Sequence, residues 1–260
     1  MLNVECFLAM NIVTNIREWR TIQRSLIGKS IGFVPTMGNL HAGHLSLCEQ
    51  SLANNDVTVV SIFVNPTQFN QAQDFDLYPR TLEQDTNLLT QQGVDYVFAP
   101  SAAEMYPDHY QVKVTETELS QELEGEFRPG HADGVLTVLI KFFNIIRPNR
   151  VYLGKKDYQQ YLLVKKMVDA LFLPIEVIPC ETLRAEDGLA LSSRNSRLTP
   201  SQRELAAHLP RLMQTLTCTQ EVTQQLTALG FKVEYVVDVG GRRLAAVWLD
   251  QVRLIDNILL

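Results

Sequence analysis

The chain has 260 residues, of which 46% are hydrophobic and 20% charged, so it can bury a sizeable core as one large domain or two unequal ones. Its formal net charge is −6 and no basic block stands out, which argues against nucleic acid as a partner. The sequence contains no run of about 18 apolar residues, so we expect no membrane span. Residues 1–9 lack the charged start of a signal peptide. Met10 offers a second start site. Four scattered cysteines without a C-x-x-C pair are typical of reduced thiols, so we expect a cytoplasmic protein.

Apolar runs with strand character alternate with helical patterns from the start of the chain. The expected helices and strands, in chain order, are helix 16–26, strand 31–34, helix 44–53, strand 57–64, helix 82–91, strand 94–99, helix 135–146, strand 150–153, helix 158–172 and strand 175–179. Such alternation predicts an α/β fold with a parallel sheet that helices cover on both faces. Residues 135–146 are apolar nearly all round, which predicts a deeply buried helix.

The pattern changes near Leu183. Residues 184–197 are polar and lack apolar periodicity, which is typical of a functional loop or hinge. Thr199 and Pro200 then have the residue types of an N-cap and a first helical position. The elements expected after them are helices at 201–216 and 221–229, the second ended by Gly230, and strands at 231–239, 244–249 and 252–255. We therefore expect a small α+β domain over residues 184–260.

Residues 35–44, PTMGNLHAGH, lie between an expected strand and an expected helix. Glycines let the backbone approach an anion closely, and the first turn of a helix offers unpaired N–H donors. Imidazoles such as those of His41 and His44 can stabilise negative charge that grows at a phosphorus atom. The spacing of these two histidines by itself fits a zinc site or a structural turn as well as a nucleotide site.

Further polar segments follow expected strands or lie at the hinge. Gln68, in NPTQF, can hold both a hydroxyl and a carboxylate, because its amide carries a donor and an acceptor. The stretch GKKDYQQ at 154–160 brings lysines that suit phosphate, and LSSRN at 191–195 has the groups of a mobile polyphosphate clamp. The stretch ELEGEFRPGH at 122–131 adds an arginine and a histidine. Each segment alone is also typical of an ordinary turn or a charged helix start. None supplies a nucleophile with an obvious partner, which favours catalysis by positioning and charge stabilisation.

Seven strings carry a resemblance to a known family, in order from about residue 31 to 258: PTMGNLHAGH, SIFVNPTQF, YPRT, ELEGEFRPGH, LGKKDYQQ, DGLALSSRN and RLIDNI. Through them the chain resembles the pantothenate synthetase (pantoate–β-alanine ligase) family of the HxGH nucleotidyltransferases. The resemblance implies an enzyme that activates pantoate with ATP as pantoyl adenylate and releases pyrophosphate. The amine of β-alanine then displaces AMP, which gives pantothenate. It also implies a cytoplasmic homodimer with a Rossmann-like domain over residues 1–183 and a small lid domain over 184–260.

The resemblance further assigns roles to residues. It implies that His44, with His41, is catalytic, that Gln68 binds pantoate and β-alanine, and that Gln160 binds pantoate. The ATP-binding residues that it implies are Met37, Gly38, Asn39, Leu40, His41, Ala42, Gly43, His44, Gly154, Lys155, Lys156, Asp157, Leu183, Leu191, Ser192, Ser193 and Arg194. Mg²⁺ is expected on the ATP phosphates, near Asp157 and without direct protein ligands. The family usually has glutamate at Lys155 and phenylalanine at Ala132, and these departures bear on local charge and on packing.

Two other functions compete with this interpretation. One is an adenylyl- or cytidylyltransferase of the same superfamily with a different acceptor. Gln68 and Gln160 argue against it, because they suit a small hydroxy acid as the acceptor. The other is a non-catalytic zinc module built on His41 and His44. That module needs further ligands, and no cluster of histidines and cysteines at suitable spacing supplies them.

Overall fold

A computed structural model of the chain describes residues 10–260. Residues 1–9, for which we expect no signal peptide, lie outside the described residues, as does Cys6. The described chain forms two compact units. The first holds the residues up to Leu40 together with His44–Leu153 and Gln159–Cys180, and the second holds His41–Gly43, Gly154–Tyr158 and Glu181–Leu260.

The first unit is built on a six-stranded sheet of order β1-β4-β3-β2-β5-β6. Its strands are β1 (Asn11–Val13), β2 (Ile31–Thr36), β3 (Val57–Ile62), β4 (Tyr96–Phe98), β5 (Arg150–Gly154) and β6 (Glu176–Cys180). The pairs β1/β4, β4/β3, β3/β2 and β2/β5 are all parallel, which confirms the predicted α/β fold. Strand β1 was not predicted, because three residues are too few to show a pattern and because its partner among the described strands, β4, is more than 80 residues away.

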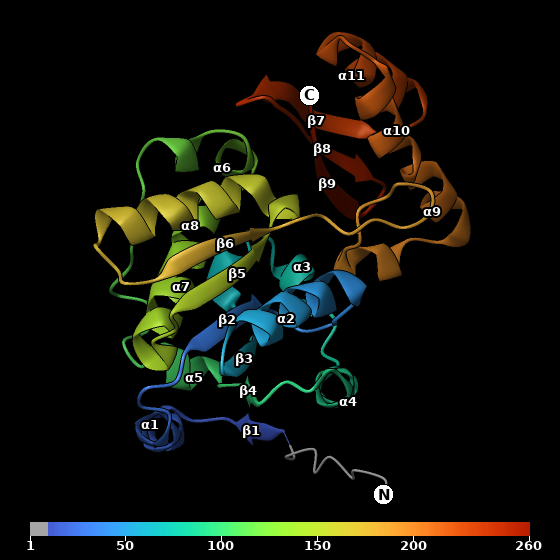
Figure 1. Cartoon of the computed structure of the whole chain (residues 1–260). Coiled ribbons are helices and arrows are strands. Elements are labelled where there is room, and N and C mark those ends of the chain that lie inside the picture. Colours follow the sequence, from blue (N-terminus) through green and yellow to red (C-terminus); the bar gives the residue numbers. More distant parts are fainter. Residues whose placement is uncertain (1–9) are drawn as a thin grey trace, which may run out of the picture. The chain divides into compact units, whose positions relative to one another are not determined.

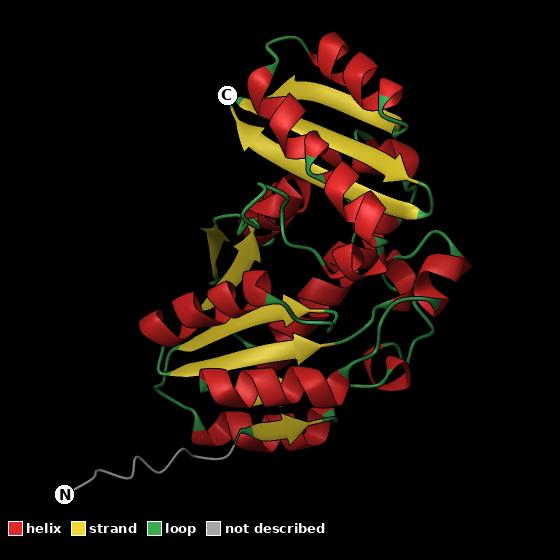
Figure 2. Ribbon diagram, turned by 90° about the vertical axis from the view of Figure 1, so that its right-hand side faces the viewer, coloured by secondary structure: helices red, strands yellow, loops and turns green. Residues whose placement is uncertain are grey.

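Helices cover both faces of this sheet, as Figure 2 shows for the yellow strands between red helices. The helices of this unit are α1 (Ile16–Ser25), α2 (Ala42–Asn54), α3 (Ala72–Asp76), α4 (Leu82–Gln92), α5 (Ala102–Met105), α6 (Glu124–Phe127), α7 (His131–Ile146) and α8 (Tyr158–Ala170). Neighbouring strand residues point into different cores. Phe33 packs in one core with residues of α1, α7 and α8, whereas Val34 packs in the other with residues of α2 and α4. This alternation is the period-two geometry of a strand between two helical layers.

Helix α7 is the deeply buried helix that its composition predicts, with most of its side chains in the core. It begins at His131, four residues before the predicted start at Val135, since Gly130 adopts a φ of 79° and ends the preceding turn. Three-residue 3-10 turns also occur where only loops were expected. They are η1 (Pro66–Gln68), η2 (Leu119–Gln121) and η3 (Lys155–Asp157), and a longer one is η4 (Ser193–Arg197).

The order of the strands places a topological switch at β2. From β2 the chain moves to β3 on one side, and β5 later joins β2 on the other side. Because these strands are parallel, β2, β3 and β5 end at the same edge of the sheet. In open α/β sheets ligands bind at this edge, beside the strand where the order reverses. The segments 35–44, 65–69 and 154–160 all begin there.

The second unit contains a three-stranded antiparallel sheet of order β7-β8-β9. Its elements are α9 (Pro200–Ala206), α10 (His208–Thr215), α11 (Thr219–Ala228), β7 (Lys232–Val239), β8 (Arg242–Leu249) and β9 (Val252–Leu259). Helices α10 and α11 lie beside this sheet (Figure 1). They bury Leu209, Met213 and Leu226 in one cluster with the sheet residues Val247 and Leu254. Strand β9 is four residues longer than predicted, because its polar residues Asp256 and Asn257 are paired and buried rather than in a turn.

The predicted helix at 201–216 is wrong in one respect, because it is two helices that meet at Ala207. Pro210 has no N–H, and its ring would clash with the carbonyl of residue 206 in a continuous helix. Helix α9 therefore ends at Ala206, and α10 begins at His208 with Pro210 in its first turn. The predicted start of α9 is confirmed. Thr199 caps it in a capping box with Gln202, and Pro200 is its first residue.

Among residues 10–260, no helix is both long enough and apolar enough to cross a membrane. The cysteines of this part of the chain, Cys48, Cys180 and Cys218, are free thiols. Burial raises the pKa of Cys48 to about 12, so this thiol stays protonated and unreactive at neutral pH.

Candidate active site

One buried carboxylate fixes the backbone of the loop after β2. Asp85 of α4 accepts hydrogen bonds from the N–H groups of Asn39, at 2.9 Å, and of Leu40, at 2.8 Å. It also accepts from the hydroxyl of Thr81 at 3.0 Å. Gly38 has a φ of 81°, and a Cβ there would lie 2.9 Å from an oxygen of Asp85. The loop therefore needs glycine at this position, both for its backbone angle and for the close approach.

His41 is a neutral hydrogen-bond donor at pH 7. Burial is the main cause that lowers its pKa to about 4; the positive charge of Lys156 acts in the same direction, and Asp157 opposes it. The Nδ1 atom accepts a hydrogen bond from the N–H of Gly43 at 3.1 Å, so the proton of the ring is on Nε2. A neutral imidazole with its N–H on Nε2 can donate to a phosphate oxygen without charging first.

His44 is the third residue of α2, a helix of 13 residues. It lies in the first turn, where backbone N–H groups and the positive end of the helix dipole favour an anion. The helix therefore begins inside the glycine–histidine segment, as the sequence predicts. The order of strand, glycine turn and helix is thus confirmed for residues 31–54.

Gln68 lies next to the loop after β2. Its Nε2 atom is 3.2 Å from the sulfur of Met37, and its Oε1 accepts a hydrogen bond from Asn65 at 2.8 Å. The Asn65 amide is itself fixed, since it donates to the carbonyl of Gly134 and accepts from the backbone N–H of Thr67. A flipped amide would bring donor against donor and acceptor against acceptor. Gln68 is consequently oriented with its N–H₂ group toward Met37.

Asn65, whose role was not predicted, orients the amide of Gln68. Its side chain is 1% exposed and also accepts a hydrogen bond from the hydroxyl of Tyr106 at 2.7 Å. Burial raises the pKa of Tyr106 to about 12, so this hydroxyl keeps its proton and remains a donor. The signal was present in part, because an asparagine before a proline is a typical turn residue. Its partner Tyr106 could not be found by spacing.

The turn η1 also packs tightly against α7. A Cβ on Gly134 would lie 2.5 Å from the carbonyl oxygen of Thr67 and 2.7 Å from the Cα of Gln68. The carbonyl of Gln68 accepts from His131 Nδ1 at 2.7 Å, and Arg128 lies 3.2 Å from the other ring nitrogen. Arginine is a donor only, so Nε2 of His131 accepts and Nδ1 carries the proton. The histidine and arginine noted at 122–131 thus hold the main chain of Gln68.

Gln159 and Gln160, neighbours at the start of α8, have different roles. Gln159 is buried, and its amide makes three hydrogen bonds, to the N–H of Glu124 and to the carbonyls of Leu119 and Glu122. It serves the structure of that loop. The amide of Gln160 is partly exposed and makes no side-chain hydrogen bond to the described residues. Gln160 is therefore the one of the pair that can bind a ligand.

The turn η3 carries the two lysines. Lys155 pairs with Glu181, so the charge that replaces the family's usual glutamate is compensated locally. Lys156 lies 3.6 Å from Asp157 and shares the surroundings of His41. Ala132, the other departure from the family pattern, is the second residue of α7 and is buried in the core.

The loop at 183–197 folds back on itself. The N–H of Leu191 donates to the carbonyl of Leu183 at 3.0 Å, and Arg184 pairs with Ala190 in an isolated bridge. Ser192 then caps η4 through the N–H of Arg194. The segment expected to be a loop is thus partly ordered into a tight turn and a 3-10 helix.

The two compact units divide the expected site residues between them. In the first unit the structure brings Met37 to Gln68, and it holds Asn39 and Leu40 in one loop. His44 and Gln160 belong to this unit as well. The second unit brings together His41–Gly43, Gly154–Asp157, Leu183 and Leu191–Arg194. A Cβ on Gly43 would lie 3.6 Å from the Cβ of Leu191, which shows how closely these segments approach.

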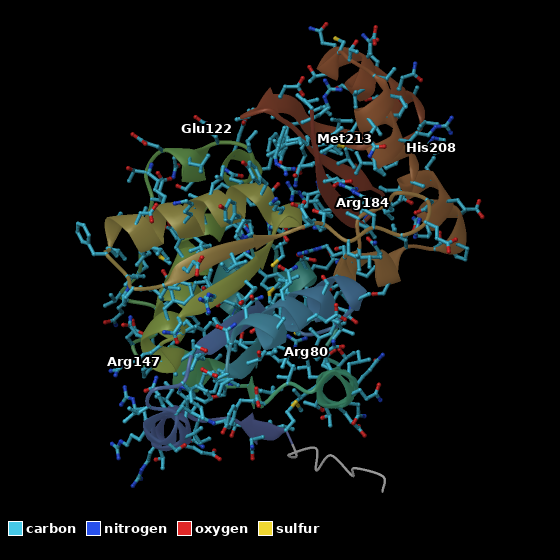
Figure 3. All side chains as sticks on the ribbon, viewed as in Figure 1. Arg80, Glu122, Arg147, Arg184, His208 and Met213 are labelled. Atoms are coloured by element: carbon cyan, nitrogen blue, oxygen red, sulfur yellow. The ribbon has the colours of Figure 1, made fainter. Side chains whose placement is uncertain are left out.

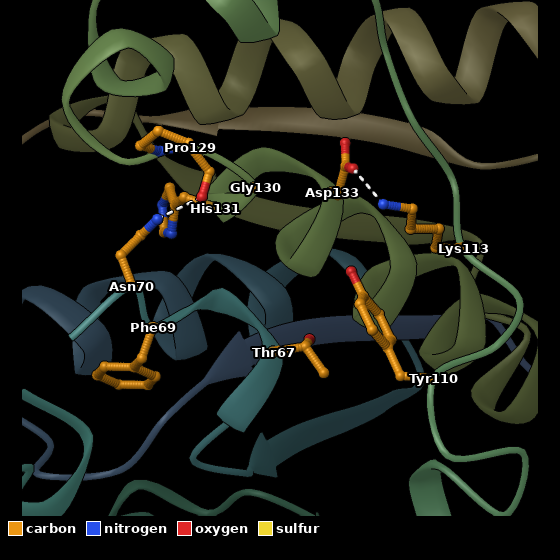
Figure 4. A pocket seen from close by; sticks show the side chains of 9 residues that line it. All are labelled: Thr67, Phe69, Asn70, Tyr110, Lys113, Pro129, Gly130, His131 and Asp133. Carbon is orange, nitrogen blue, oxygen red and sulfur yellow. Dashed lines mark hydrogen bonds and ion pairs between the residues drawn. The ribbon is translucent and has the colours of Figure 1, made fainter. Parts of the chain in front are cut away.

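A pocket of about 300 Å³ lies on the first unit beside η1 (Figure 4). Its lining residues are Thr67, Phe69, Asn70, Tyr110, Lys113, Pro129, Gly130, His131 and Asp133. Lys113 and Asp133 form an ion pair at 3.2 Å, and Asn70 donates to the carbonyl of Pro129. None of the residues to which the resemblance assigns a role lines this pocket, and Lys113 and Asp133 are paired with each other.

The side chains of this part of the chain offer few donors for the expected Mg²⁺. Within residues 10–260, no group of three or more histidine, cysteine, aspartate or glutamate side chains could hold a metal ion. Asp157 is about half exposed, with one carboxylate oxygen 3.6 Å from Lys156. This donor set fits Mg²⁺ carried by phosphates, since Mg²⁺ keeps several waters and takes only one or two carboxylates from a protein.

A parallel α/β sheet with a glycine–histidine turn at its switch point defines an α/β nucleotide-binding class of protein. A family model described as Pantoate-beta-alanine ligase matches residues 9–259. A pantothenate synthetase from Legionella pneumophila strain Corby is 50% identical over 252 residues, which cover 96% of this chain and 100% of the relative. One from Bdellovibrio bacteriovorus is 47% identical and covers 94% and 96%. The chain belongs to the pantoate–β-alanine ligase family.

Solved structures agree with this assignment. The pantoate–β-alanine ligase of Francisella tularensis, complexed with Beta-gamma ATP and Beta-alanine, has a TM-score of 0.93 and 43% identity, covering 96% of this chain and 98% of that one. The pantothenate synthetase of Thermus thermophilus has a TM-score of 0.88 and 40% identity, covering 96% and 99%.

Proposed function

We propose that this chain condenses pantoate with β-alanine at the expense of ATP, in two steps. A carboxylate oxygen of pantoate attacks the α-phosphorus of ATP, and the bond to the bridging oxygen of pyrophosphate breaks. The amine of β-alanine then attacks the acyl carbon of pantoyl adenylate, and AMP leaves with the electrons of the C–O bond. The observation that carries the proposal is the contact of Gln68, an oriented amide, with Met37 of the glycine–histidine loop.

The residues act by binding and by charge stabilisation. Attack at the α-phosphorus puts excess negative charge on its oxygens, which His44, the neutral N–H of His41, Lys156 and Arg194 offset. The N–H₂ group of Gln68 donates to an oxygen of pantoate, and the amide of Gln160 holds the same substrate. The remaining ATP contacts are those that the resemblance implies: Met37, Gly38, Asn39, Leu40, Ala42, Gly43, Gly154, Lys155, Asp157, Leu183, Leu191, Ser192 and Ser193.

Pyrophosphate–ATP exchange tests this function. We expect exchange that requires pantoate and does not require β-alanine, since the adenylate forms before the amine enters. Gln160→Ala should raise the KM for pantoate about tenfold, because it leaves groups of a desolvated ligand unpaired. The matched control is Gln159→Ala, which should lower thermal stability and leave the KM for pantoate unchanged. Exchange that needs β-alanine would contradict the two-step order.

The lid role of residues 184–260 rests on the loop Ser192–Arg194, whose groups can bind a polyphosphate when the loop orders around it. A closed lid shields the acyl adenylate from water. We expect Arg194→Ala to slow adenylation and to release the adenylate to hydrolysis. The measurement is AMP formed per pantothenate at limiting β-alanine. A wild-type ratio together with wild-type ATP affinity would mean that the loop is only a connection.

The resemblance also supports Mg²⁺, a homodimer and a cytoplasmic location. Mg²⁺ bound to ATP supplies charge neutralisation at the phosphates, and Asp157 is the carboxylate placed to hold one of its waters. Dependence of exchange on Mg²⁺, the sedimentation of the purified chain and cell fractionation check these three points separately.

A further inference from the structure

Asn257, near the end of the chain, clamps the turn that carries the two lysines. It lies on β9 and is 3% exposed. Its Nδ2 atom donates to the carbonyl of Lys155 at 2.8 Å and to the carbonyl of Lys156 at 2.9 Å. One side-chain amide thus holds two successive main-chain carbonyls of η3, which is about 100 residues earlier in the sequence.

The orientation of this amide is fixed by a second residue. Arg242 Nη1 donates to Asn257 Oδ1 at 2.8 Å, and a guanidinium can only donate, so Oδ1 cannot exchange places with Nδ2. The guanidinium of Arg242 lies 4.8 Å from the ring centre of Tyr158, the residue that follows η3. The Nδ2 atom of Asn257 thus connects β9 to the lysine turn η3. Its Oδ1 atom holds Arg242 of β8, which contacts Tyr158 just after that turn.

The backbone at Asn257 is anchored as well. Arg184, labelled in Figure 3, donates to both carboxylate oxygens of Asp256, at 2.7 and 2.9 Å. It also donates to the carbonyl of Asn257 at 3.0 Å, and the N–H of Asn257 donates to Asp256 at 2.7 Å. Asp256 is 3% exposed, so this pair is shielded from solvent. These hydrogen bonds hold the backbone that carries the Asn257 amide.

The lysine turn needs such support. It has three residues, two of them adjacent lysines, and the hydrogen bonds of a 3-10 turn have poorer geometry than those of an α-helix. Anchoring the two carbonyls removes backbone freedom that ATP would otherwise have to remove on binding. We propose that Asn257 is a positioning residue that fixes Lys156 and Asp157 for ATP. This inference rests on the proposed function, since it concerns the same site.

The test compares Asn257→Ala with Glu234→Gln. Glu234 on β7 is also a largely buried partner of an arginine, 2.6 Å from Arg253, and it has no bond to η3. Losing two hydrogen bonds predicts a rise of about tenfold or more in the KM for ATP in Asn257→Ala, with the KM for pantoate unchanged. The increase in Tm that saturating ATP gives should shrink in parallel. Glu234→Gln should lower the Tm of the free protein and leave both KM values as in the wild type.

A double-mutant cycle separates positioning from general destabilisation. In a Lys156→Ala background, Asn257→Ala should add little further rise in the KM for ATP, because the group that it positions is already gone. Should Asn257→Ala not fold, Asn257→Ser retains an acceptor for Arg242 and allows the same comparisons.

The outcomes are distinct. If the wild type shows no pantoate-dependent exchange, the proposed function is wrong. If the wild type is active and Asn257→Ala keeps a wild-type KM for ATP, or if its effect adds fully to that of Lys156→Ala, the positioning role is overturned.

Discussion

His44→Ala is expected to slow formation of the adenylate by about 10²–10³ while it changes the KM for pantoate little. The removed imidazole acts on charge that develops only as the carboxylate attacks phosphorus. The variant should therefore bind the substrates almost as tightly as the wild type, whereas the transition state should lose most of the stabilisation that this imidazole provides. The measurement is the rate at which pantoyl adenylate forms in a single turnover, with enzyme in excess over ATP and pantoate at a saturating concentration.

The control for this experiment is His109→Asn. His109 is an exposed histidine with a φ of 51°, an angle that asparagine tolerates, so the variant removes an imidazole without new strain. It should keep the wild-type rate. A wild-type rate in His44→Ala would remove this residue from the chemistry and leave charge stabilisation to the helix N-terminus, the N–H of His41 and the cations.

Asp85→Asn is expected to disorder the loop after β2, to which we assign ATP binding, although it changes a single atom. Asp85 is 1% exposed and uses both oxygens as acceptors from the N–H groups of Asn39 and Leu40. An amide puts a donor against one of these N–H groups and leaves it unsatisfied, at a cost of about 1–3 kcal/mol in stability. Because the affected groups belong to the loop, the KM for ATP should rise about tenfold or more.

Asp95→Ala is the matched control, because it also leaves one backbone N–H without its acceptor. The carboxylate of Asp95 accepts from the backbone N–H of Thr58 at 2.8 Å, at the start of β3 and outside the loop. It should lose a comparable amount of stability, as measured by the free energy of unfolding in urea, with a wild-type KM for ATP. If both variants raised the KM for ATP equally, Asp85 would matter only for folding.

Asp85 also illustrates what a sequence pattern can hide. It lies four residues before Leu89, on the face of α4 that is buried, and a carboxylate at such a position must have partners. The pattern could therefore have marked it as a residue with a polar role. It could not say that the partners are N–H groups more than 40 residues earlier.

The sequence by itself determined most of the longer helices and strands of this protein, and only the tertiary structure decided how the site is held. Gly38, the start of α2 within two residues of its predicted position and the cap at Thr199 follow from local backbone chemistry, so they can be predicted from neighbouring residues. The break at Ala207 was equally local and was missed, because Pro210 lies within an apolar pattern that reads as one helix. Asp85, Asn65 and Asn257 each act through hydrogen bonds to residues distant in the sequence. A hydrogen bond of this kind has no periodicity or spacing, because it depends on where the packed sheet and helices bring two backbone segments together.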